Sequence, residues 1–431
     1  MPGIAELARR IDTLDRELSA CSRCGMCQAV CPLYAQTGNE GDVARGKLTL
    51  LEGLKDELFN NPDGVMDRLN RCLLCGSCEA ACSCEVKVLE IFLKARAILE
   101  EFKGLSLAKK IILRHILSKP GVFDKAVKTA GRYQNLFIKN AGGHQNTSCA
   151  RLLSPIPSIR HFTPISDQPF HDRYPSMNTS PGKSGLKAAF FPGCLLDKVY
   201  PQVAHAVVKV LDHHGVGIFL PQGQGCCGIP AISSGDMDTF TRLMNHNSSL
   251  FEEEDVDYLV TACATCTFTI KKVWPMMCDA SSENRETIHR LSEKTMDISE
   301  FLVSVIGVTP CEQVLETKER VTYHDPCHLK KSLGVEKAPR VLIRANPFCR
   351  LTEMEAPDNC CGMGGGFSLF HYGMSSDIGE KKRDAILATE STTVATGCPA
   401  CMMQIADVLS KHNDPVAVKH VIELYADTIS D

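Results

Sequence analysis

The chain has 431 residues, enough for two or three domains with a sizeable core. Its 47 lysines and arginines nearly balance its 51 aspartates and glutamates, so its charge does not suggest nucleic-acid binding. No apolar run approaches the ~18 residues of a membrane-spanning helix, and residues 1–20 carry charges throughout, unlike a signal peptide. We therefore expect a cytoplasmic protein, in which 23 cysteines indicate metal or redox chemistry rather than disulfides.

The first predicted element is an amphipathic helix over residues 4–18. Its apolar residues recur every three or four positions, at Ile4, Leu7, Ile11, Leu14 and Leu18. Such a helix packs either on its own domain or on a partner protein.

Two cysteine runs with the same spacing follow. The first contains Cys21, Cys24, Cys27 and Cys31, and the second contains Cys72, Cys75, Cys78 and Cys82. In such a run three thiols on one tight turn hold one cubane, and the fourth reaches the other cluster. Structural zinc is the alternative, although zinc sites seldom use four cysteines in one such run. We predict two [4Fe–4S] clusters, held by Cys21, Cys24, Cys27 and Cys82, and by Cys31, Cys72, Cys75 and Cys78.

The second run departs from the usual pattern at its end. Pro32 follows Cys31, whereas Ser83 and Cys84 follow Cys82. Cys84 therefore competes with Cys82 for the remote ligand position, and the spacing favours Cys82. Basic residues close to the cysteine motifs either offset cluster charge or belong to the solvated surface; they are Arg71, Lys198, Lys330 and Lys331.

The middle of the chain is predicted to form a helical insert and a connector. Residues 90–101 continue as helix, and residues 105–140 are apolar and basic together. The second pattern fits a core-packed helix with a solvated basic face, or a helix on an anionic membrane, which would make the protein peripheral on the cytoplasmic face. Residues 141–187 are expected to form an extended connector, because prolines recur there: Pro155, Pro157, Pro164, Pro169, Pro175 and Pro181.

From residue 187 onward the chain repeats itself. Each copy contains one cysteine, then an adjacent pair, then Cys-x-x-Cys, and the second copy follows the first by 133 to 135 residues. Five matched thiols at a nearly constant offset indicate a duplicated unit. The first copy carries Cys194, Cys226, Cys227, Cys263 and Cys266, and the second carries Cys327, Cys360, Cys361, Cys398 and Cys401.

Strands and helices alternate within both copies, which predicts parallel sheets with right-handed crossovers. Every cysteine of the motif then falls beyond the carboxyl end of a strand, where open α/β sheets bind ligands. The predicted strands cover residues 186–191, 216–220 and 258–261, then 321–324, 351–354 and 393–396, with helices near 236–253, 338–345, 377–389 and 399–411.

Five converging thiols favour an iron–sulfur cluster. A tetrahedral zinc needs only four ligands, so five thiols overfill its site. A dithiol–disulfide centre is the other chemical alternative. His324 and His328 flank Cys327 and are candidates for proton transfer, although a lone histidine is more often a core or surface residue. The cysteines outside the motifs are expected to be ordinary buried thiols: Cys84, Cys149, Cys278, Cys311 and Cys349.

These motifs together resemble a known family. A two-cluster ferredoxin followed by two Cys-Cys-Gly (CCG) repeats is similar to the iron–sulfur subunit of glycolate oxidase and related D-lactate dehydrogenases. The same parts occur in heterodisulfide reductases, in which complete repeats bind noncubane [4Fe–4S] clusters through five cysteines. The resemblance thus implies two further clusters here, held by Cys194, Cys226, Cys227, Cys263 and Cys266, and by Cys327, Cys360, Cys361, Cys398 and Cys401.

The resemblance also implies a function and partners. We expect an electron-transfer subunit of a flavoprotein 2-hydroxyacid dehydrogenase, which accepts electrons from an FAD-containing subunit and passes them to an acceptor such as a quinone. No flavin is expected in this chain, because Gly362–Gly366 follows a cysteine pair and does not fit a dinucleotide fingerprint. The alternative is a heterodisulfide-reductase-like catalytic subunit that reduces a disulfide or another small acceptor.

The expected fold is α/β with a helix-rich N-terminal part. A helical two-cluster ferredoxin domain covers residues 1–100, and a helical insert with a proline-rich linker covers 101–186. Two tandem α/β CCG repeats follow at residues 187–315 and 316–431. The chain is expected to be part of an oxidoreductase complex and to be inactive on the hydroxy acid by itself.

Overall fold

The computed structural model describes residues 3–141, 145, 147–150, 160–311 and 319–429, which divide into two compact units. The helical unit consists of Met1–Ser118, Gly228–Arg242 and Gly362–Ile378, and the sheet unit consists of Lys119–Cys227, Leu243–Cys361 and Gly379–Asp431. Two segments of the helical unit therefore begin directly after an adjacent cysteine pair. The expected boundary between residues 315 and 316 lies outside the described residues.

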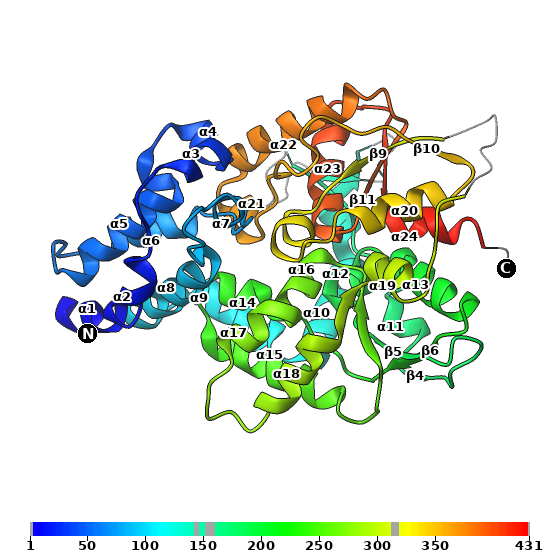
Figure 1. Cartoon of the computed structure of the whole chain (residues 1–431), viewed down its shortest axis with the longest axis horizontal. Helices are drawn as coiled ribbons and strands as arrows, with labels where there is room; N and C mark the ends of the chain where they lie inside the picture. The colour runs from blue at the N-terminus through cyan, green and yellow to red at the C-terminus, as the bar shows by residue number, and fades with distance from the viewer. Residues whose placement is uncertain (1–2, 142–144, 146, 151–159, 312–318, 430–431) are drawn as a thin grey trace. The chain divides into compact units, whose positions relative to one another are not determined.

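The helical unit is built from short helices around an apolar centre. Helices α1, α5, α6 and α8 pack against one another (Figure 1) and bury Leu7, Ile11, Leu51, Leu54 and Phe92. The helices that lie wholly in this unit are α1 (Ile4–Asp12), α2 (Asp15–Leu18), α3 (Met26–Val30), α4 (Tyr34–Thr37), η1 (Glu40–Asp42), α5 (Ala44–Lys55), α6 (Asp63–Asn70), α7 (Ser77–Ala80), α8 (Val88–Lys103), α9 (Leu107–Lys110), η2 (Ile111–Leu117), α14 (Ile229–Ser233) and α21 (Gly366–Phe370).

The expected single helix over residues 4–18 is two helices, α1 and α2. The Thr13 hydroxyl donates to the carbonyl of Arg10 at 2.7 Å, a local bond of the kind that competes with helix continuation. The chain turns there and resumes helical structure at Asp15. Leu7, Ile11 and Leu14 are nevertheless all buried, because the break keeps the apolar positions on one side.

The sheet unit contains two mainly parallel sheets, one from each copy of the repeat. The first has the order β4-β6-β5-β7-β8, with only β4 antiparallel, and the second has the fully parallel order β10-β9-β11-β12. The strands are β4 (Met177–Asn178), β5 (Lys187–Phe190), β6 (Gly217–Leu220), β7 (Tyr258–Thr261), β8 (Thr295–Asp297), β9 (Glu319–His324), β10 (Cys349–Leu351), β11 (Thr393–Thr396) and β12 (Ala417–His420).

One apolar core joins the two copies. Helices α13, α19, α20 and α24 pack on one another, and Val207, Phe301, Leu342 and Val421 belong to the same buried cluster. The remaining helices are α10 (Pro120–Phe137), α11 (Phe170–Arg173), α12 (Gly193–Lys198), α13 (Pro201–His213), α15 (Met237–Leu250), α16 (Ala264–Phe268), η3 (Thr269–Val273), α17 (Trp274–Met277), α18 (Arg285–Lys294), α19 (Ile298–Ser304), η4 (His328–Ser332), α20 (Lys337–Ala345), α22 (Tyr372–Leu387), α23 (Pro399–Lys411) and α24 (Val421–Ala426).

The predicted class, a helical N-terminal region followed by tandem α/β repeats, is confirmed. The strands differ in detail. The predicted strand at 351–354 lies at Cys349–Leu351, and β8 and β12 were not predicted. Each of these two strands has only three or four residues and leads straight into a helix, so neither shows a period-2 pattern long enough to recognise.

The connector expected at residues 141–187 is more ordered than predicted. Strands β1 (Ile138–Asn140), β2 (Ser148–Ala150) and β3 (His161–Phe162) form a small antiparallel sheet. Gln145 donates to the carbonyls of Asp414 and Val416 at 2.7 and 2.9 Å, which ties this segment to the second copy. Pro155 and Pro157 lie outside the described residues.

The described helices include none that is both long and apolar enough to cross a bilayer. The basic and apolar segment predicted at 105–140 is helical, as α9, η2 and α10. Ile111 and Ile112 are exposed on it, while Leu113 and Leu117 are buried.

A buried carboxyl group makes the stability of the sheet unit depend on pH. Asp297 caps α19, accepting the Ser299 N–H at 2.9 Å, and burial raises its pKa to about 7. Because the folded-state pKa is raised, the stabilising contribution is complete below pH ~4 and is lost as pH rises through about 7.

We expect Asp297→Asn to raise the melting temperature at pH 8, because the amide keeps a good N-cap without a buried charge. At pH 5 the effect should be smaller. The stabilisation by Asp297→Asn should differ between the two pH values by on the order of a few kcal/mol of unfolding free energy. Thermal unfolding of the loaded chain across pH 5–8 measures this, with the exposed Asp255→Asn as control. If the melting temperatures of wild type and Asp297→Asn changed in parallel with pH, Asp297 would not be the group responsible for the pH dependence.

Candidate metal centres

The first cysteine set lies around one cavity of the helical unit. Its lining includes Cys21, Cys24, Cys27 and Cys82, the four residues predicted to act together. Cys78 and Cys84 also contribute to the wall. Cys84 is exposed, and its thiol donates to the Ser22 hydroxyl at 3.2 Å. The structure thus brings both candidates for the remote ligand position, Cys82 and Cys84, to the same cavity.

The second cysteine set lies around a neighbouring cavity, lined by Cys31, Cys72, Cys75 and Cys78. Helices α3 and α7 each begin just after a glycine with positive φ, at Gly25 (84°) and Gly76 (73°). These glycines turn the chain tightly between the second and third cysteines of each run. The ferredoxin-like spacing is thereby converted into two compact thiol clusters.

Two buried cations next to the second cavity were not predicted from the sequence. Lys47 is 1% exposed, lines the cavity and donates to the carbonyl of Asp42. Burial lowers its pKa, while Cys72 and Cys31 favour its charged form. Arg96 donates to the carbonyls of Cys72 at 2.8 Å and Ser233 at 2.6 Å. The available signal for Arg96 was its place on the apolar face of a helix, between Phe92 and Leu99.

The first five-cysteine set lies at the carboxyl edge of its sheet. The Sγ atoms of Cys194 and Cys226 are 3.9 Å apart. A Cβ on Gly193, whose φ is +68°, would lie 2.9 Å from Cys266 Sγ, so the chain needs glycine where it passes that thiol.

The adjacent cysteine pair of the first copy is held by its carbonyls. Asn247 donates to the carbonyl of Cys226 and Trp274 to that of Cys227, both at 2.9 Å. Both donors are fully buried, so the two thiols are fixed by a rigid surrounding structure.

The second five-cysteine set has a histidine among its thiols. Cys361 and Cys401 have Sγ atoms 3.5 Å apart. These two atoms and a ring nitrogen of His324 all lie within 4.8 Å of one another. Cys398 interacts with Cys401, Cys360 is buried, and Cys327 is partly exposed at the start of η4.

The two five-cysteine sets adjoin inside the sheet unit. Cys263 and Cys398 are the N-caps of α16 and α23, positions where the helix dipole favours a thiolate. The N–H of Ala264 donates to the carbonyl of Gly397 at 3.1 Å, and the Thr265 hydroxyl lies 3.6 Å from Cys398 Sγ. Duplication has therefore brought two separate thiol sets face to face.

The thiols of these sets are suited to a cationic group. Neighbouring thiols together with burial raise the pKa of Cys226, Cys266 and Cys401 well above the ordinary range. Contact with Cys263 lowers the pKa of Cys398. Thiols so deeply buried ionise only beside a compensating cation, and they release their protons when a metal binds. The chemistry of the donors thus fits an iron–sulfur cluster.

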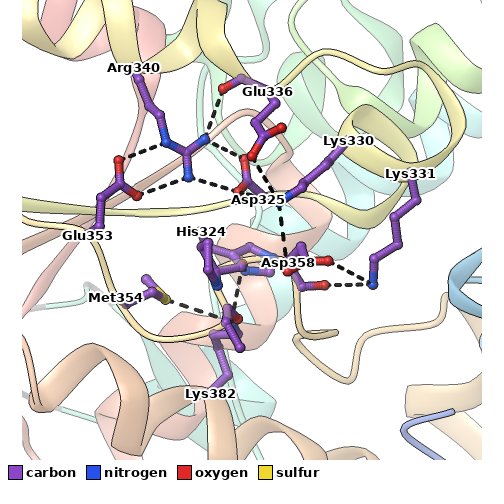
Figure 2. A network of polar contacts seen from close by, with 12 residues as sticks. His324, Asp325, Lys330, Lys331, Glu336, Arg340, Glu353, Met354, Asp358 and Lys382 are labelled. Carbon is purple, nitrogen blue, oxygen red and sulfur yellow. Dashed lines mark hydrogen bonds and ion pairs between the residues drawn. The ribbon is translucent and has the colours of Figure 1, made fainter. Parts of the chain in front are cut away.

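A charged network follows Cys327 in the second copy (Figure 2). Arg340 binds both carboxylate oxygens of Asp325, at 2.8 and 2.9 Å, and also pairs with Glu353. Lys330 and Lys331 contact the Asp358 carboxylate at 3.8 and 3.6 Å. At the position of Asp325, two residues before the first cysteine, the first copy has Pro192.

Buried groups complete this network. Lys382 donates to the carbonyls of Ala356 at 3.0 Å and Pro357 at 3.2 Å, and burial lowers its pKa to about 8. His324 Nδ1 lies 3.1 Å from the same Pro357 carbonyl (Figure 2). Burial lowers the pKa of His324 to about 3, so its imidazole is neutral at pH 7.

The other two basic residues selected from the sequence, Lys198 on the same helix as Cys194 and Arg71 next to Cys72, pair with carboxylates. Lys198 pairs with Asp197 and Asp124 at 2.7 Å, and Arg71 pairs with Asp67. The expectation that the five remaining cysteines are buried is wrong: Cys84 is exposed, and partly exposed thiols occur at Cys149, Cys278, Cys311 and Cys349. Cys84 lies two residues after Cys82, and Cys278 directly follows α17. The sequence alone does not show which side of such a segment faces solvent.

Known proteins match the chain over nearly its whole length. A family model described as "4Fe-4S dicluster domain" matches residues 17–86, and one described as "Cysteine-rich domain" matches 188–271 and 321–406. A "Probable glycolate oxidase iron-sulfur subunit" of Bacillus subtilis is 29% identical, over 93% of this chain and 90% of its own length.

Two further relatives extend the comparison. A "Lactate utilization protein A" of Exiguobacterium is 30% identical over 55% of this chain and 95% of its own length. One component of the dihydromethanophenazine:CoB–CoM heterodisulfide reductase of Methanosarcina barkeri is 26% identical over 96% of this chain and 94% of its own length.

The fold and the thiol sets define an iron–sulfur protein that combines a dicluster ferredoxin region with tandem cysteine-rich domains. The chain belongs to the glycolate oxidase iron–sulfur subunit family, as its motifs indicated.

Trp274, the single tryptophan, provides a built-in reporter for the first set. Its indole is fully buried and donates to the carbonyl of Cys227, so an iron–sulfur group there should quench its emission by energy transfer. We expect loading with iron and sulfide to quench the fluorescence of the metal-free chain. In loaded chains, Cys227→Ala should restore more emission than Cys361→Ala. Equal recovery in the two variants would show that the group nearest Trp274 is not held by Cys227.

Proposed function

We propose that the chain is the iron–sulfur electron-transfer subunit of a flavoprotein 2-hydroxyacid dehydrogenase that acts on glycolate or D-lactate. Its partner is an FAD-containing subunit, and its acceptor is a quinone or another membrane electron carrier. The relatives named for glycolate oxidase and lactate utilization support this choice. In the complex, a flavin in the partner would supply hydride chemistry toward the hydroxy acid, and clusters held by this chain's cysteines would accept electrons one at a time.

The ligand assignment follows the two cavities of the helical unit. Cys21, Cys24, Cys27 and Cys82 are proposed to hold one [4Fe–4S] cluster, and Cys31, Cys72, Cys75 and Cys78 the other. Their convergence on two cavities supports this pairing. The spacing favours Cys82 over Cys84 as the remote ligand. Lys47 and Arg96 would offset the negative charge of the second cluster from positions that solvent does not reach.

The repeats are proposed to hold two further clusters of the noncubane [4Fe–4S] type. The ligands would be Cys194, Cys226, Cys227, Cys263 and Cys266, and Cys327, Cys360, Cys361, Cys398 and Cys401. The contact between the Cys263 and Cys398 loops, made by Ala264 with Gly397 and by Thr265 with Cys398, supports the electron-transfer function, because it makes the two sets immediate neighbours. Adjacent centres suit a relay, whereas two independent structural metals would not need to meet.

A second candidate is a catalytic subunit that reduces a disulfide or another small acceptor. The charged network beside Cys327 favours this candidate, together with the similarity to a component of a heterodisulfide reductase. The two functions differ in what the chain does alone. Disulfide reduction by the chemically reduced, isolated chain would support the second candidate, and its absence would support the first.

Reconstitution with the flavoprotein partner tests the electron-transfer function. The chain alone should be inert with glycolate or D-lactate, and adding the partner with substrate should reduce its clusters. Cys31→Ser and Cys82→Ser should each slow cluster reduction in stopped-flow spectra while flavin reduction stays fast. Cys149→Ser, outside every set, serves as control. Oxidation of the hydroxy acid by the flavin-free chain would overturn the proposal.

Iron analysis tests the ligand assignment. Four four-iron clusters require about sixteen iron atoms per chain, and clusters in the helical unit alone require about eight. We expect Cys82→Ser to lower the iron content by about four atoms and Cys84→Ser to leave it unchanged. The reverse result would make Cys84 the remote ligand.

A further inference from the structure

His324 is a buried histidine with one ring nitrogen left over. It ends β9, three residues before Cys327, and its side chain is 1% exposed. Nδ1 lies 3.1 Å from the Pro357 carbonyl, whereas Nε2 has no hydrogen-bond partner among the described residues. A buried polar atom without a partner destabilises a fold, so a fold that retains one calls for an explanation.

The hydrogen bond determines which nitrogen carries the proton. A carbonyl oxygen only accepts, and Pro357 also accepts from the Lys382 ammonium, so Nδ1 must be the donor. In a ring that carries one proton on Nδ1, Nε2 therefore presents a lone pair. A bare nitrogen cannot donate to sulfur, and Cys361 and Cys401 have no proton to offer once they act as thiolates. An electrophile is the remaining partner, and metal-bound histidines commonly donate their other N–H to a carbonyl in this way.

The first copy shows that the fold itself does not require histidine here. The residue three places before Cys194 is Phe191, which is also fully buried and packs against Phe251. The strand accepts an aromatic ring of similar size without a polar atom. The ring nitrogens of His324 are thus a feature of the second copy that the shared backbone does not require.

Another buried histidine provides a contrast. His420 ends β12 and is also fully buried, but its Nδ1 accepts the Ile422 N–H at 3.2 Å. Its Nε2 therefore carries the proton and, like Nε2 of His324, makes no hydrogen bond with the described residues, although the carbonyls of Gly397 and Ala262 lie nearby. His420 has the opposite tautomer and no free lone pair, although burial and neighbourhood are similar.

We propose that His324 Nε2 binds an iron of the cluster in the second five-cysteine set, which becomes a mixed nitrogen–sulfur site while the first stays all-thiolate. This inference rests on the proposed cluster there. A neutral imidazole compensates less of the positive charge of iron than a thiolate does, and histidine ligation raises the potential of an iron–sulfur centre. The second cluster is then the more oxidising of the adjoining pair, so electrons collect beside the charged network of Figure 2.

Nitrogen hyperfine spectroscopy on the full-length loaded chain tests the proposal. A Cys227→Ala background removes the first cluster, and the sample is poised where the second is paramagnetic. We expect a hyperfine coupling typical of a directly bound imidazole nitrogen. When the chain is grown with ¹⁵N-histidine, the size of this coupling should change by the ratio of the nuclear g factors of ¹⁵N and ¹⁴N. His324→Phe, which copies the first repeat, should abolish the coupling and lower the midpoint potential of this cluster. His420→Asn and His328→Asn should retain both.

The outcomes separate this inference from the proposed function. Loss of about four iron atoms in Cys361→Ala, relative to wild type, establishes that the second set holds a cluster. If that cluster is present without a histidine coupling in the otherwise wild-type second set, His324 is not a ligand, although the cluster assignment stands. If no iron is lost, the cluster assignment itself fails. If His324→Phe fails to take up the cluster, the other measurements still identify the ligand. A ¹⁵N-histidine shift that persists in His420→Asn and His328→Asn would assign the bound nitrogen to His324.

Discussion

The burial of many thiols without enough positive charge is the constraint on which the structure depends. Adjacent thiols such as Cys361 and Cys401 cannot all ionise in an apolar interior unless a cation compensates them. Parallel strands bring these thiols together because their carboxyl ends share one edge. The fold thus assembles a site that is unfavourable for the protein alone and favourable once metal is bound, so that metal affinity and folding become one free-energy term.

Cysteine spacing predicted more of the molecule than any other pattern did. It indicated the helical ferredoxin region and the duplicated α/β units, because ligand geometry restricts spacing more tightly than packing does. What it missed depends on tertiary structure. Lys47 has no distinguishing neighbours in the sequence, and the lone pair of His324 exists only because Pro357 meets its other nitrogen. The short strands β8 and β12 were missed because three or four residues carry too little periodicity.

The two copies have diverged in chemistry while keeping their backbone. Both place two thiols at a helix N-terminus and an adjacent pair beyond a strand, yet the first is bordered by Phe191 and Trp274 and the second by His324 and Asp325. At these positions apolar side chains lower the local dielectric, whereas an imidazole and a paired carboxylate supply fixed dipoles. Duplication therefore allows one fold to present two adjoining thiol sets of different character.

The division of the chain between its units has a consequence for biosynthesis. The helical unit is not contiguous: it needs Gly228–Arg242 and Gly362–Ile378, each of which starts directly after a cysteine pair. A ribosome releases residues in order, so this unit remains incomplete until most of the chain has been synthesised. Cluster insertion into a finished helical unit is accordingly a late event, and a gene cut between the ferredoxin region and the repeats would leave the ferredoxin fragment without two segments of its own unit.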